Sequence, residues 1–188
     1  MLHRSCIVLA ALLFVAVAGQ RAAADSRLEP FFGTYVGSAD SVDMRSGETE
    51  QRDMDVVVSS HKNGGFKIHW TNVTRVNGRR DVPGVIRRVA DAVFEKAEGH
   101  DYFVGVSDYS PFRTREAAEL MSGDPLRWAV VDDEGMHLYN FVVLDDGRYE
   151  MQVYDRSLSD IGMDITYQRF VDGELRRLIT GRTVRIDD

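Results

Sequence analysis

Hydrophobic and polar residues alternate along most of the chain, which is the pattern of β-strands that bury one face. In residues 66–76, for example, Phe66, Ile68 and Trp70 fall on one face of an extended segment. The alternation predicts strands over 31–42, 52–60, 66–76, 89–97, 102–107, 126–131, 136–144, 148–155, 163–171 and 174–186.

Short segments rich in glycine, asparagine and aspartate separate these strands. The clearest is Asn63-Gly64, because an Asn-Gly pair tolerates the positive φ angles that tight hairpin turns require. Asp172-Gly173 joins two later strands in the same way. Consecutive hairpins favour a meander, and closing a meander into a barrel removes its exposed edges. We therefore predict a mainly β protein that forms a single antiparallel up-and-down barrel of about ten strands.

Two segments fit this pattern less well. Residues 85–97 are compatible with a helix or a strand, and we favour a strand over 89–97. Residues 114–121 predict one short helix, because Thr114 can cap its start and the following residues are mostly strong helix formers. Gly123 is placed to end it.

The first 24 residues have the layout of a cleavable secretory signal. An arginine near the start precedes an unbroken apolar run over 7–18, and three alanines at 22–24 then supply the small residues that a signal peptidase needs. We expect cleavage before Asp25, which leaves residues 25–188 as a single barrel domain. The predicted location is outside the cytoplasm, most simply the bacterial periplasm.

Two other interpretations of the leader fit the sequence less well. A membrane-spanning helix needs about 20 apolar residues, and this run has twelve. A lipoprotein needs its cysteine just after the apolar run, whereas Cys6 precedes it. We therefore expect no transmembrane anchor in the mature protein.

Removal of the leader makes the protein more acidic and leaves it without cysteine. The chain has 23 basic and 30 acidic residues, and the leader takes two arginines and no acid, so the mature part has a net charge of −9. Such a charge argues against nucleic-acid binding, which needs a basic face. Cys6 is the only cysteine, so disulfides, thiolate metal sites and cysteine nucleophiles are excluded after cleavage.

The start and end of the predicted barrel resemble a known family. Gly33-Thr34-Tyr35 lies on the first strand, and Arg182 and Arg185 lie on the last. These features resemble the lipocalin-like, calycin-type barrels, in which a Gly-x-Trp of the first strand packs near an arginine that closes the base. Tyrosine stands here in place of tryptophan. The Phe-x-Gly-x-Tyr opening and the strand at 149–154 are also similar to exported bacterial proteins of unassigned function.

Motifs of catalysis and cofactor binding are missing from the sequence. The four histidines of the mature part lack the close spacing of a metal site. His69 and His137 each lie opposite the more apolar face of their strand, which argues against a haem ligand inside the barrel. The acidic segments 132–135 and 145–147 fit hairpin turns better than calcium loops. We predict neither metal nor cofactor, and the sequence leaves open whether the protein is an enzyme.

The best functional signal is a set of aromatic, methionine and amide side chains on successive predicted strands. Concave apolar sites with a few polar groups are typical of ligand pockets. We expect the cavity-lining residues to be Trp70, Asn72, Trp128, Tyr139, Phe141, Met151, Tyr154 and Tyr167.

Three functions remain open from the sequence. The first is an exported binding protein for a small hydrophobic or amphipathic ligand. The second is a cell-envelope interaction or structural protein with a filled barrel, which contacts an envelope protein through 111–125. The third is an enzyme with a site inside the barrel.

Overall fold

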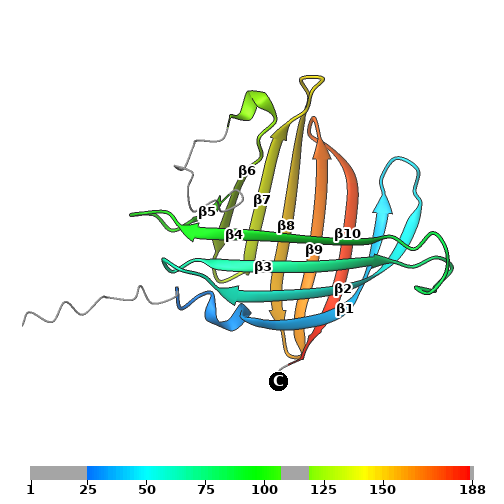
Figure 1. The fold of residues 1–188 in the computed structure, drawn as a ribbon, viewed down its shortest axis with the longest axis horizontal. Coiled ribbons are helices and arrows are strands. Elements are labelled where there is room, and N and C mark those ends of the chain that lie inside the picture. The colour runs from blue at the N-terminus through cyan, green and yellow to red at the C-terminus, as the bar shows by residue number, and fades with distance from the viewer. Residues whose placement is uncertain (1–24, 107–118, 187–188) are drawn as a thin grey trace, which may run out of the picture.

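The computed structural model describes residues 25–106 and 119–186, which contain ten strands and two short 3₁₀ helices (Figure 1). The strands are β1 (Gly33–Asp43), β2 (Thr49–Ser60), β3 (Phe66–Thr74), β4 (Arg87–Lys96), β5 (Phe103–Val106), β6 (Leu126–Val131), β7 (Met136–Val143), β8 (Tyr149–Ser159), β9 (Gly162–Val171) and β10 (Glu174–Arg185). The 3₁₀ helices are η1 (Glu29–Phe31) and η2 (Leu120–Ser122).

Each strand pairs antiparallel with its neighbours in sequence, and β10 pairs with β1 to close the barrel. Tyr35 of β1, for example, lies opposite Val56 of β2 and Arg185 of β10. The predicted mainly β fold, a single up-and-down barrel of about ten strands, is therefore confirmed. Figure 1 shows the strands of the two halves crossing at a steep angle around the interior.

The two ambiguous segments have different outcomes. The strand favoured for 89–97 is confirmed as β4, Arg87–Lys96. The helix expected over 114–121 falls largely outside the described residues, and the described part that follows is the 3₁₀ turn η2. Gly123 ends η2 with a φ of 84°.

The leader, 1–24, also lies outside the described residues. No helix in the described ranges has the length and hydropathy to cross a membrane.

Large apolar side chains fill the end of the barrel at which the chain enters. Phe66 lies parallel to Phe94 with ring centroids 4.9 Å apart, and it meets Phe103 edge-on at 5.4 Å. Fully buried apolar side chains of the core include Leu28, Tyr35, Phe66, Ile68, Phe103, Val131, Met136 and Met163. This end is therefore a closed, packed base.

Tyr35 and Arg185 close the base together with η1. The Tyr35 hydroxyl donates a hydrogen bond to the Phe31 carbonyl at 3.0 Å. The Arg185 guanidinium lies 5.9 Å from the centroid of the Tyr35 ring and donates to the Phe32 carbonyl at 2.7 Å. This contact between an aromatic residue of the first strand and an arginine of the last is consistent with a lipocalin-like barrel.

The close approach of β1 to β10 depends on a residue without a side chain. A Cβ atom at Gly37 would lie 2.1 Å from the backbone oxygen of Arg182 on β10. Only glycine allows the two strands to approach this closely.

Candidate functional site

A pocket of about 220 Å³ lies inside the barrel, beside the packed base. Most of its lining residues share the strand face that carries the buried core, so they point inward. Those residues are Trp70, Ala90, Ala92, Phe94, Arg127, Leu138, Asn140, Gln152, Tyr154 and Arg156. Asp91 and Tyr139, which lie on the opposite face of their strands, complete the lining. The pocket thus has an apolar and aromatic side and a polar side.

The polar side begins with a row of side chains in register across four strands. Arg127 of β6 lies opposite Asn140 of β7, Asn140 lies opposite Gln152 of β8, and Gln152 lies opposite Arg169 of β9. The Asn140 Oδ1 atom is buried without a hydrogen-bond partner among the described residues. A buried amide oxygen of this kind is costly unless something bonds to it.

A chain of hydrogen bonds crosses this side of the barrel and neutralises one arginine. The Tyr154 hydroxyl donates to Gln152 at 2.7 Å, and the Gln152 amide donates to Glu150 at 2.5 Å. Arg169 donates twice to the second oxygen of Glu150, at 2.8 and 2.6 Å. Burial tends to raise the pKa of Glu150, but the bonds from Arg169 and Gln152 lower it overall. Glu150 is therefore ionised and balances Arg169.

No carboxylate among the described residues balances the charge of Arg156. Its side chain is almost completely buried, with 3% exposed, and its Nε and Nη1 atoms have no hydrogen-bond partner among the described residues. It lies opposite Met136 on one side and Ile165 on the other, both of which are buried and apolar. Burial lowers the pKa of Arg156 to about 10, so the guanidinium still carries its charge at neutral pH.

Two other arginines on the inward faces of their strands have carboxylate partners. Arg52, which is 5% exposed, pairs with Glu50 at 2.7 Å, as Arg169 pairs with Glu150 at 2.6 Å. Arg127 resembles Arg156, since it lines the pocket and has no carboxylate within ion-pair distance among the described residues. Within the described ranges, the pocket therefore holds two arginines without a carboxylate partner.

Aromatic rings also line the pocket or pack against its lining. Trp70 of β3 faces Tyr154 of β8 with ring centroids 6.0 Å apart, and Tyr154 packs on Tyr167 at 4.7 Å. Burial raises the pKa of both tyrosines, so their hydroxyls stay protonated and neutral. The Arg156 guanidinium lies 5.6 Å from the centroid of the Tyr154 ring.

Only some of the residues predicted to line a cavity line this pocket. Trp70, Tyr139 and Tyr154 line the pocket, and Tyr167 packs directly behind Tyr154. Asn72 is not among the lining residues, although its position two residues after Trp70 places it on the same face of β3.

The other three predicted residues lie on the outward faces of their strands. Trp128 adjoins the buried Ala129, so it points away from the interior. On the outer face it stacks on Tyr139, with ring centroids 5.0 Å apart. Phe141 stacks on the exposed Tyr149 at 5.9 Å. Met151 lies opposite Phe141 and alternates with the buried Glu150. These three residues do not contribute to the pocket.

The sequence prediction missed the arginines. On β8, Gln152, Tyr154 and Arg156 share the inward face, and Met151 and Val153 point outward. This is the reverse of the usual arrangement, in which the apolar face of a strand is buried. The signal in the sequence is the spacing of Tyr154 and Arg156, since residues two apart in a strand share a face.

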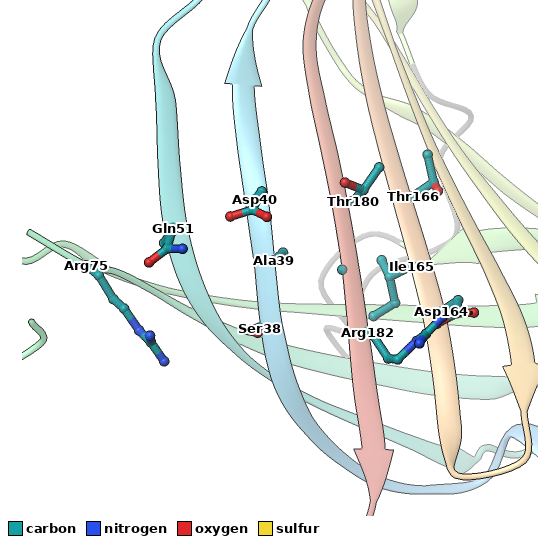
Figure 2. Close-up of a pocket in the computed structure, with 11 residues that line it drawn as sticks. Ser38, Ala39, Asp40, Gln51, Arg75, Asp164, Ile165, Thr166, Thr180 and Arg182 are labelled. Carbon is teal, nitrogen blue, oxygen red and sulfur yellow. Dashed lines mark hydrogen bonds and ion pairs between the residues drawn. The ribbon is translucent and has the colours of Figure 1, made fainter. Parts of the chain in front are cut away.

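A larger hollow, of about 490 Å³, lies on the outer side of β2, β1, β10 and β9 (Figure 2). Both arginines of its lining are already paired: Arg182 lies 2.7 Å from Asp164, and Arg75 forms an ion pair with Asp53. Figure 2 shows the Arg182 and Asp164 side chains side by side at its edge. We place the candidate site inside the barrel, where Arg156 is buried and has no carboxylate partner in the described part of the chain.

Comparisons with known proteins supply no function for this chain. No protein-family model matches the sequence, and no curated protein matches it significantly. Within the described ranges, no three histidine, cysteine, aspartate or glutamate side chains come together as a group that could hold a metal ion.

Proposed function

We propose that this protein is an exported, lipocalin-like binding protein that holds a small amphipathic molecule inside its barrel, with the periplasm as its location. The observation that carries the proposal is the internal pocket, which Trp70 and Phe94 line together with polar groups of β6, β7 and β8. Pockets for small molecules combine these two features, a mostly apolar wall and a few polar groups that fix orientation.

The size of the pocket supports a compact ligand. One water molecule takes about 30 Å³ of liquid, so a volume of about 220 Å³ equals about seven waters. That volume fits a ligand on the order of ten non-hydrogen atoms. A barrel filled entirely by its own side chains would leave no such space, so the pocket favours ligand binding over the filled-barrel alternative.

The chemistry of the lining favours binding over catalysis. The described lining residues include no histidine, serine or cysteine. Its one carboxylate, Asp91, is close to Lys67 at 3.1 Å and to His69 at 3.0 Å on the outward face. A nucleophile with an adjacent base is the usual requirement for covalent hydrolysis, and the described lining does not supply it.

Two measurements test the proposal. Purification of the protein from the periplasmic fraction of its own cells, followed by N-terminal sequencing, is expected to give a chain that begins at Asp25; a full-length cytoplasmic protein would contradict export. Native mass spectrometry of the same sample is expected to show an adduct of low mass that denaturation releases. A protein that is empty in its own envelope and fails to bind any small amphipathic probe would refute ligand binding.

A further inference from the structure

The binding site contains a buried cation, Arg156, that no carboxylate among the described residues balances. Arg156 is buried in a row of apolar residues, and two of its nitrogen atoms have no hydrogen-bond partner among the described residues. Native structures rarely contain such a group without a reason, because a buried charge without a partner costs several kcal/mol. Three arrangements stabilise a buried cation of this kind: an ion pair, a hydrogen-bond network or a bound ligand.

No carboxylate in the described ranges forms an ion pair with Arg156. The nearest acidic side chain on the inward face of its strand is Glu150, which is already bonded to Arg169 and Gln152. Asp155, the next residue along β8, points outward and lies 2.7 Å from His137. No salt bridge between Arg156 and any described carboxylate exists within 4.0 Å.

The contact with Tyr154 does not satisfy Arg156 either. The guanidinium carbon lies 5.6 Å from the centroid of the Tyr154 ring, which is within the range of a cation–π contact. Such a contact involves the face of the ring and the charge, whereas the N–H donors of a guanidinium lie in its plane. The Nε and Nη1 donors of Arg156, which have no acceptor among the residues that the structure describes, can therefore bond to a group in the pocket.

Arg127 is a second cation of the pocket for which the described part of the chain offers no carboxylate partner. It lies on the wall of the same pocket, in register with Asn140, and its charge acts on the Tyr154 hydroxyl together with that of Arg156. The chain as a whole has a net charge of −7, so these inward cations are not a consequence of a basic composition. Interior positive charge in an acidic protein indicates that the pocket selects negative charge.

We propose that the ligand is a compact carboxylate: an aryl or medium-chain acid whose anionic end is held by Arg156 and Arg127 and whose apolar body packs against Trp70 and Phe94. This inference rests on the proposed function, since it names the class of ligand for the same pocket. A guanidinium matches a carboxylate with two parallel hydrogen bonds, which a neutral amide or alcohol does not provide. Asn140, whose amide can turn to present its NH₂ group, adds a donor beside Arg127.

The test compares acids with neutral molecules of the same shape. Isothermal titration calorimetry measures how tightly the mature protein binds two pairs of ligands: octanoate and octanamide, and benzoate and benzamide. Acetate is included as an anion that lacks an apolar body. The acids are expected to bind about 10- to 100-fold more tightly than the amides, which is the effect of a charge-assisted hydrogen bond. Acetate is expected to bind at least tenfold more weakly than octanoate.

Variants then assign the preference to the arginines. Arg156→Met is expected to bring the acids and amides to within about threefold of each other, Arg127→Met to reduce the preference partly, and Arg156→Lys to retain part of it because lysine keeps the charge without the planar fork. The control is Arg182→Met, which removes an arginine from the outer face of β10, where it pairs with Asp164. This control is expected to leave the preference unchanged.

The outcomes separate this inference from the proposed function. If acids and amides bind equally well to the wild-type protein, the barrel binds small amphipathic molecules but the inference about the anion is wrong. If the preference for acids survives in both Arg156→Met and Arg127→Met, the anion is held elsewhere and the inference is again wrong. If no compound of either kind binds, both the inference and the proposed function fail.

Discussion

Replacing Arg156 with methionine is expected to make the empty protein more stable. In the folded protein, burial lowers the pKa of Arg156 from 12.5 to about 10. At about 1.4 kcal/mol for each pH unit, this corresponds to about 3 kcal/mol of unfavourable free energy for the charged side chain. Methionine suits the site, since its neighbours across the strands are Met136 and Ile165. Partial relaxation around the new side chain reduces the gain, so we expect about 1–3 kcal/mol.

The assay is urea unfolding of the ligand-free mature protein at pH 7, followed by circular dichroism. Arg156→Met is expected to raise the midpoint without a change in the slope, because the surface exposed on unfolding stays the same. For a domain of this size, each kcal/mol corresponds to about 2–4 °C in melting temperature. Arg182→Met, at a side chain that is 70% exposed, is the matched control and is expected to change stability by less than about 0.5 kcal/mol.

The opposite result would refute the reasoning. If Arg156→Met lowers the free energy of unfolding by more than about 1 kcal/mol, Arg156 has a structural partner and is not a free cation. Arg156→Lys provides a second check, because it keeps a cation in the apolar row and is expected to give no gain. A gain with lysine as large as that with methionine would mean that charge is not the cause.

Three further predictions concern the barrel itself, each checked by denaturant unfolding. Tyr35→Phe removes the hydrogen bond at the base and is expected to cost about 1–2 kcal/mol; an unchanged stability would mean that the base does not depend on it. Gly37→Ala is expected to lower the free energy of unfolding by about 1–3 kcal/mol, because the new Cβ clashes with the backbone of β10. Ser38→Ala is the neutral control, and equal effects of the two substitutions would argue against the clash. Burial lowers the pKa of His137, but two aspartates, of which Asp155 is the nearer, raise it overall above 6.5. The charged His137 therefore stabilises the fold fully below pH 6.5, and this stabilisation is lost as the pH rises through the raised pKa. The loss in the free energy of unfolding is expected to be less than about 1 kcal/mol. His137→Gln should remove this dependence of stability on pH. If the variant keeps the same pH dependence, His137 is not its source.

The sequence predicted the barrel well because the evidence for it is local. Alternating residues and Asn-Gly or Asp-Gly turns specify strands and hairpins one at a time, and β6, for example, has the predicted bounds of 126–131. Closure then follows from consecutive pairing. The one short helix, at 114–121, stays a prediction, because most of it lies outside the described residues.

The interior of the barrel was harder to predict, because β6, β7 and β8 carry large apolar side chains on both faces. Met151 and Tyr154 are three residues apart, so they cannot both point inward, and the alternation alone does not say which one does. Arg156 breaks the pattern outright, since a charged residue in a strand is normally placed on the outer face. Violations of this kind are expected at functional sites, where local rules give way to binding.

A nuclear magnetic resonance titration of the two tryptophan indole groups tests the central claim most directly. Trp70 lines the pocket, whereas Trp128 stacks on Tyr139 on the outward face. The Trp128→Phe variant assigns the two signals. As octanoate is added, the Trp70 indole signal is expected to shift saturably at one ligand per protein, with a much smaller change at Trp128. An unchanged Trp70 signal, or a shift at Trp128 alone, would contradict a ligand site inside the barrel.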